Sequence, residues 1–120
     1  MSSTETLSNA EHLTESERTC LRLCQEAVRV SELCADECAR LDDVPPERRR
    51  LCRDVSDVAA LHAALLARGS AHREALAGLC ATVCRDCAAA CESHEHENDT
   101  VRTTADVLRD CAEACDTMVK

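Results

Sequence analysis

Pairs of cysteines separated by three residues are the feature that most constrains this 120-residue chain. Residues four apart on an α-helix lie on one face, one turn apart, so each pair directs two thiols to the same region of space. Ten of the eleven cysteines belong to such pairs, which are Cys20/Cys24, Cys34/Cys38, Cys80/Cys84, Cys87/Cys91 and Cys111/Cys115; Cys52 stands alone. This pattern predicts helices that carry sets of thiol ligands.

The pairs also follow one another at helical spacing. Alternate steps of four and three residues link two sets of positions: Cys20, Cys24, Ala27, Ser31, Cys34, Cys38 and Leu41, and then Cys80, Cys84, Cys87, Cys91 and His94. A stripe with this period is typical of the inward face of a helix in a bundle. The cysteines therefore take positions that leucine and isoleucine normally occupy in a core.

Composition narrows the class of protein. The chain has no Phe, Tyr or Trp, so a folded domain must obtain its stability from small aliphatic side chains, oligomerisation or bound metal. A formal charge of −9 argues against a nucleic-acid-binding protein that needs a basic patch. Because no signal-peptide pattern and no run of about 18 apolar residues occurs, we expect a cytoplasmic protein without a membrane partner.

The thiols are better suited to metal than to disulfides. Cytosolic thiols stay reduced, and clustered cysteines there usually serve metal or redox chemistry. The Cβ atoms of residues i and i+4 on a helix lie about 5–6 Å apart, against roughly 3.5–4.5 Å in a disulfide. Each pair therefore fits a bridging metal ion better than an internal disulfide.

Capping and breaking residues divide the first half of the chain into two helices. Thr14 and Glu17 form a capping box, which predicts a helix that runs to about Leu41. Pro45 and Pro46 end that segment and open the second helix, because proline is tolerated only in a first turn.

Similar signals divide the second half. Gly69 predicts the end of the second helix and Ser70 the cap of a third, which runs to about His96. Residues 98–100 are expected to form the turn that connects the third helix to the fourth, and the fourth helix reaches Met118. Short connections between four helices predict an all-α, antiparallel, up-down-up-down bundle over residues 14–120. Residues 1–13 are expected to be an N-terminal extension or a short extra helix.

The antiparallel order groups the cysteines by height along the bundle, at about 1.5 Å per residue. One predicted cluster holds Cys20, Cys24, Cys111 and Cys115, with His62, His72 and Met118 close by. A second, at the opposite end, holds Cys34, Cys38, Cys52, Cys87 and Cys91, with His94 and His96. Between the clusters lie Ala27, Ser31, Ser56, Ala59, Thr104 and Leu108, and only Cys80 and Cys84 connect the two.

Thiolates select soft metals, namely Cu(I), Zn(II) or iron–sulfur clusters. A monovalent ion neutralises buried thiolates one for one, which favours multiple Cu(I) ions in an extended thiol lining. The alternatives are a four-cysteine zinc site, an iron–sulfur cluster, and a redox sensor that forms cross-helix disulfides. His62, at the bundle mouth, His94 and Met118 are candidate additional ligands. Arg48 to Arg50 are expected on the surface. No catalytic motif appears, so we expect no enzyme.

Three segments carry a family resemblance: residues 66–70 (LARGS), 79–94 (LCATVCRDCAAACESH) and 111–118 (CAEACDTM). Together they resemble the copper storage proteins, a family of four-helix-bundle copper-binding proteins. The resemblance implies an antiparallel bundle whose interior cysteines hold many Cu(I) ions, with all eleven cysteines here as ligands. It also implies a homo-oligomer, since cytosolic members form tetramers, and a copper chaperone or exporter as exchange partner.

The chain departs from the family pattern in the middle of the bundle. Members often have cysteine where this chain has Ala27, Ser31, Ser56, Ala59, Thr104 and Leu108. The resemblance therefore implies a cysteine-depleted member with a lower copper capacity.

Overall fold

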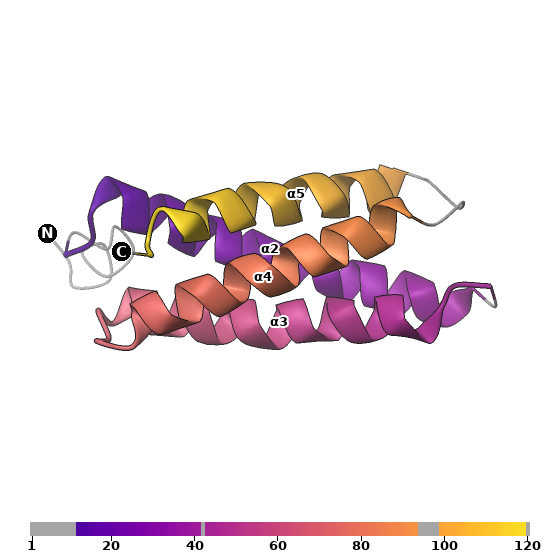
Figure 1. Cartoon of the computed structure of the whole chain (residues 1–120), viewed down its shortest axis with the longest axis horizontal. Coiled ribbons are helices and arrows are strands. Elements are labelled where there is room, and N and C mark those ends of the chain that lie inside the picture. The colour runs from indigo at the N-terminus through magenta and orange to yellow at the C-terminus, as the bar shows by residue number, and fades with distance from the viewer. Residues whose placement is uncertain (1–11, 42, 94–98, 120) are drawn as a thin grey trace, which may run out of the picture.

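The computed structural model describes residues 12–41, 43–93 and 99–119. These residues form four α-helices and no strand: α2 (Glu15–Arg40), α3 (Pro46–Ala67), α4 (Arg73–Glu92) and α5 (Asp99–Asp116). The helices run alternately up and down along one long axis, with the α2–α3 loop at the opposite end from the α3–α4 turn (Figure 1). The neighbouring pairs are α2–α3, α3–α4, α4–α5 and α2–α5. The predicted antiparallel four-helix bundle is confirmed.

Side-chain contacts across α2 and α5 show the antiparallel register. The Sγ atoms of Cys20 and Cys115 lie 3.8 Å apart, and those of Cys24 and Cys111 also lie 3.8 Å apart. A step forward of one turn along α2 is therefore matched by a step back of one turn along α5. Between α4 and α5, the ion pairs Arg85–Asp116 and Arg109–Glu92 follow the same rule.

The first helix begins as its sequence predicts. The Glu17 backbone N–H donates to the Thr14 hydroxyl at 3.1 Å, and the Thr14 backbone N–H donates to the Glu17 carboxylate at 2.9 Å. The reciprocal bonds satisfy two of the backbone donors that a helix start leaves free. Pro46 is the first residue of α3, as expected for a residue without a backbone N–H.

Two predicted boundaries differ in the structure. Helix α4 begins at Arg73, and its N-cap His72 forms no side-chain capping bond. The Ser70 hydroxyl instead accepts from the His72 backbone N–H at 3.1 Å, so Ser70 stabilises an intervening turn rather than the helix. Helix α4 ends at Glu92 rather than near His96, and Asp99 already belongs to α5.

All eleven cysteines are buried and reduced, so the thiols form much of the core. The residues predicted to separate the two cysteine clusters are also buried: Ala27, Ser31, Ser56, Ala59, Thr104 and Leu108. Leu41, by contrast, does not continue the inward stripe, because it is 37% exposed where α2 has already ended.

Two remaining expectations concern the N-terminal segment and the membrane. The predicted short N-terminal helix lies outside the described residues, apart from a turn at residues 12–13. Among the described helices, none combines the length and apolar character needed to cross a membrane.

Candidate metal centre

One group of thiols surrounds a buried histidine. His62, on α3, is fully buried, and its Nδ1 atom lies 3.3 Å from the Cys24 Sγ atom and 3.7 Å from the Cys115 Sγ atom. The side chains of Cys20, Cys24, His62 and Cys115 place one ligand atom each within 4.8 Å of the others. Three helices thus contribute to one four-ligand set.

A second set shares two of these sulfurs. The Sγ atoms of Cys24, Cys80, Cys111 and Cys115 also lie within 4.8 Å of one another, and Cys84 interacts with the thiols of Cys111 and Cys80. Helix α4 therefore joins this group. We call the whole group the histidine end; it consists of Cys20, Cys24, His62, Cys80, Cys84, Cys111 and Cys115.

The opposite end of the bundle holds a separate group. The Sγ atoms of Cys34, Cys52 and Cys91 lie within 4.8 Å of one another, and the Cys87 Sγ atom lies 3.6 Å from that of Cys52. The Cys38 thiol interacts with that of Cys34. We call this group the arginine end, because Arg48 also belongs to it; its thiols are Cys34, Cys38, Cys52, Cys87 and Cys91.

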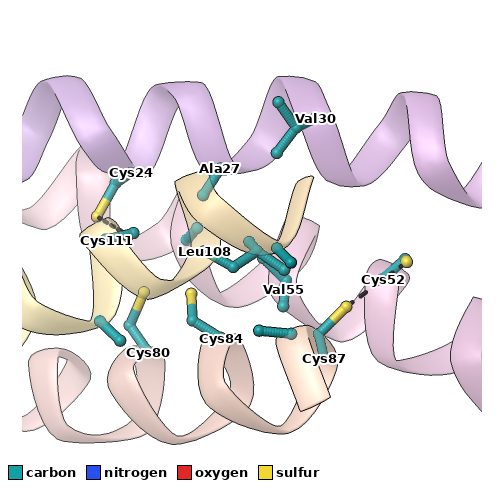
Figure 2. Packing of buried hydrophobic residues seen from close by; sticks show 14 of the residues in the cluster. Cys24, Ala27, Val30, Cys52, Val55, Cys80, Cys84, Cys87, Leu108 and Cys111 are labelled. Carbon is teal, nitrogen blue, oxygen red and sulfur yellow. Dashed lines mark hydrogen bonds between the residues drawn. The ribbon is translucent and has the colours of Figure 1, made fainter. Parts of the chain in front are cut away.

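Apolar side chains separate the two ends. Figure 2 shows Cys24 facing Cys111 on one side and Cys52 facing Cys87 on the other, with Ala27, Leu108 and Val55 labelled between them. The sequence predicted this interruption, but it placed Cys80 and Cys84 between the clusters. The structure instead brings Cys80 into contact distance of Cys24 and Cys111, so α4 contributes to both ends.

The close packing of the thiols lowers the pKa of some of them and raises the pKa of others. Contact with Cys115 and Cys24 lowers the pKa of Cys20 to about 4, since neighbouring S–H groups donate to its sulfur. Contact with Cys34 and Cys52 likewise lowers the pKa of Cys91. At Cys38, burial is the main cause that raises the pKa to about 11. Each end therefore has a sulfur that favours the thiolate form, which is the form that binds metal.

The additional ligands predicted from the sequence differ in where the structure places them. His62 is fully buried and lies among thiols. Met118 is half-buried and packs against the core after the end of α5. His94 and His96 lie outside the described residues. His72 is exposed and belongs to none of the ligand sets found among the described residues.

Arg48 is the functional candidate that sequence reasoning missed. It was expected on the surface with Arg49 and Arg50, but its side chain is only 2% exposed, and its Nη2 atom donates to the Cys34 Sγ atom at 3.5 Å. A signal was available, because Arg48 precedes Cys52 by four residues and so shares its inward face on α3. The run of three arginines concealed that periodicity.

The sulfur geometry suits metal ligation. The Sγ–Sγ separations of 3.6 to 3.8 Å far exceed the roughly 2.05 Å of a disulfide bond. They match the spacing of two thiolates that share one metal ion, given metal–sulfur bonds of about 2.3 Å. Both ends consist of soft sulfur donors, with one imidazole at the histidine end, and such donors select Cu(I) or Zn(II).

Comparisons with solved structures agree with this arrangement. The chain is similar to the Cu(I)-bound copper storage protein BsCsp3, with a TM-score of 0.82 and 23% identity over 88% of this chain and 100% of that one. Apo copper storage protein 3 from Bacillus subtilis gives a TM-score of 0.76, with 24% identity over 86% and 98% of the two chains. These likenesses establish the fold.

A third structure has a higher sequence identity. The copper storage protein Ccsp from Streptomyces lividans, loaded with 10 copper equivalents, is 28% identical over 88% of this chain and 84% of that one, with a TM-score of 0.81. No curated protein sequence matches the chain.

The family comparison covers nearly the whole sequence. The family model described as copper storage protein matches residues 10–120, which contain all four of the described helices and all eleven cysteines. The resemblance seen in the cysteine-containing segments is thus confirmed, and this chain belongs to the copper storage protein family.

Proposed function

We propose that this protein stores Cu(I), which it binds as several ions through the thiolates of its buried cysteines. The observation that carries the proposal is the gathering of eleven reduced, buried thiols into two groups, in which sets of three or four ligand atoms lie within 4.8 Å of one another. Buried thiolates are costly unless a cation neutralises them, and each Cu(I) neutralises one. All eleven cysteines serve as ligands in this proposal, with His62, His94 and Met118 as candidate additional ligands.

Zinc is the second candidate, because one set of thiols has the geometry it prefers. Cys24, Cys80, Cys111 and Cys115 place four sulfurs within 4.8 Å of one another, as a tetrahedral zinc site requires. Four thiolates around one Zn(II) leave two negative charges, however, and no Arg or Lys among the described residues is buried at this end. Charge balance therefore favours Cu(I) over Zn(II).

The protein we propose is a store rather than an enzyme, and it works in the cytosol, where thiols stay reduced. One of the similar structures is of a cytosolic copper storage protein from Streptomyces lividans. A copper chaperone or exporter would exchange copper with it. Residues 14–120 form the metal-binding domain, and the side chain of Leu13, just before it, is buried.

A homo-oligomer, with a tetramer as the expected state, is part of the same proposal. Four large apolar side chains are about half exposed on the isolated chain: Leu33, Leu61, Leu79 and Val119. Exposed apolar side chains on several helices are what further copies of the bundle would cover. Native mass spectrometry of the intact protein measures this state directly.

An anaerobic metal titration tests the storage function. Reduced apoprotein is titrated with Cu(I) against a chelator of known affinity, and with Zn(II) in parallel. We expect about eight to eleven tightly bound Cu(I) ions per chain, close to one per thiolate. Saturation at one or two ions of either metal would contradict storage, and folding that depends on one Zn(II) would support the structural alternative.

A further inference from the structure

Arg48 is a buried cation without an ordinary partner. It lies in the first turn of α3, and its Nη2 atom donates to the Cys34 Sγ atom at 3.5 Å. Its Nε and Nη1 atoms are also buried, and neither has a hydrogen-bond partner in the described part of the chain. The adjacent residues Arg49 and Arg50 are exposed. The fold therefore selects one of three consecutive arginines for the interior.

Such a group is unfavourable in the metal-free protein. A buried guanidinium cannot lose its proton and keeps its charge, and two unsatisfied donors add a desolvation cost. Burial disfavours the charge of Arg48, but contact with the Cys34 sulfur and the nearby thiols of Cys91 and Cys38 outweighs burial and holds its pKa above the ordinary value. The groups that favour its charge are thus the expected metal ligands.

The number of thiolates and Cu(I) ions at the arginine end indicates a role for the Arg48 charge. The arginine end has five thiols, from Cys34, Cys38, Cys52, Cys87 and Cys91. If all five are thiolates, four Cu(I) ions leave one negative charge, which a single guanidinium cancels. The histidine end has six thiols and no buried Arg or Lys among the described residues, so with a neutral His62 ring its neutrality requires one Cu(I) per thiolate.

We propose that Arg48 is the fixed counter-charge of an anionic copper–thiolate cluster at the arginine end, a cluster with one fewer Cu(I) than thiolates. This inference rests on the proposed storage of Cu(I). The guanidinium binds no copper and acts through the sulfurs, above all that of Cys34. Copper loading displaces the remaining thiol protons beside this guanidinium, so the excess negative charge there becomes permanent. Arg48 therefore stabilises the loaded protein more than the empty one.

Three variants separate this role from a purely structural one. Arg48→Met removes the charge and keeps the length of the side chain, Arg48→Lys keeps the charge, and Arg49→Met is a control for loss of an exposed arginine. Copper affinity is measured for each variant by anaerobic chelator competition. Anomalous diffraction from Cu(I)-loaded crystals shows which end has lost copper, and melting of the apo forms reports stability.

We expect Arg48→Met to weaken copper binding at the arginine end by about tenfold to a thousandfold, as for removal of one charge of a close pair away from water. The histidine end should stay loaded, and the apo form should melt no lower than the unmodified protein. Arg48→Lys should retain most of the affinity, and Arg49→Met all of it. A merely structural arginine would instead lower apo melting and weaken copper binding at both ends.

Several results would overturn the inference. They are an unchanged arginine-end affinity in Arg48→Met, a loss in Arg48→Lys as large as in Arg48→Met, and an apo Arg48→Met protein that does not fold. If the unmodified protein takes up no copper at either end, the storage function itself fails. If the histidine end stays loaded while Arg48→Met changes nothing, only the role of Arg48 is wrong.

Discussion

The histidine end and the arginine end use similar sulfurs in different electrostatic surroundings. At the histidine end, the Nδ1 atom of His62 lies beside the thiols of Cys24 and Cys115, and an imidazole nitrogen can ligate a metal ion. At the arginine end, Arg48 contacts Cys34 through a group that remains positive at every accessible pH. One end thus offers an extra donor atom, and the other offers a permanent charge.

This difference shows how one bundle can hold two metal–thiolate clusters of different composition without a change of fold. The apolar layer of Ala27, Val55 and Leu108 keeps the two groups of sulfurs apart (Figure 2). Sites that share no ligands behave almost independently. The following experiments test that independence and then the properties of each end.

Removing one cysteine pair should have the largest effect. In Cys20→Ser/Cys24→Ser, the histidine end loses the two sulfurs that contact Cys115 and Cys111. We expect most of the copper at that end to be lost while the arginine end stays loaded. The matched variant Cys34→Ser/Cys52→Ser should show the reverse pattern.

Copper content and copper-bound crystal structures of both double variants provide the measurement. Equal loss at the two ends in either variant would show that the apolar layer does not separate them.

Copper should also stabilise the fold in proportion to the ends that are loaded. The core lacks aromatic side chains, and an ion that binds only the folded state adds stability by mass action, about 4 kcal/mol at a thousand times Kd. We expect the melting temperature to rise by about 10 °C or more on full loading, and by less in the double variants. Calorimetry under reducing conditions measures this order. Equal melting of apo and loaded protein would place the copper outside the folded core.

A smaller effect is expected when the imidazole is removed. His62 has a buried Nε2 atom without a hydrogen-bond partner among the described residues, so His62→Leu removes an unsatisfied group and should not destabilise the apo form. Copper at the histidine end should bind about ten- to a hundredfold more weakly, while the arginine end is unchanged. Chelator competition measures the affinity, with His72→Gln as the exposed-histidine control. Loss of apo stability without loss of copper affinity would indicate a packing role.

The fold could be predicted from the sequence because its signals are local. The capping box at Thr14, the prolines at the start of α3 and the four-residue spacing of the cysteines each act within one or two turns of helix. The antiparallel order then fixed the heights at which Cys20 meets Cys115 and Cys24 meets Cys111. These contacts follow from topology and helical rise alone.

The details of the two ends could not be predicted in the same way. Whether Arg48 turns inward depends on its phase relative to Cys52, and the neighbouring Arg49 and Arg50 carry no such signal. Heights counted from the predicted helix ends place Cys80 in the middle, because Ser70 predicts an earlier start for α4 than Arg73, where the helix begins. An error of less than one turn is enough to change which sulfurs appear to meet.

The smallest predicted effect is the gain of one copper ion at the boundary between the ends. Ser31 lies one helical turn before Cys34, lines the same small pocket as Cys52, and has a buried hydroxyl without a partner among the described residues. Ser31→Cys replaces that hydroxyl with a thiol, which tolerates burial better, so the apo form should gain about 1 kcal/mol. The new thiolate should extend the arginine end and bind one more Cu(I), because Arg48 already balances the single excess charge there.

Ser56→Cys is the matched control. The Ser56 hydroxyl donates to Glu32, so that substitution should destabilise the apo form. Anaerobic titration and apo melting of both variants give the answer, and an unchanged capacity in Ser31→Cys would show that the arginine end cannot grow toward the apolar layer.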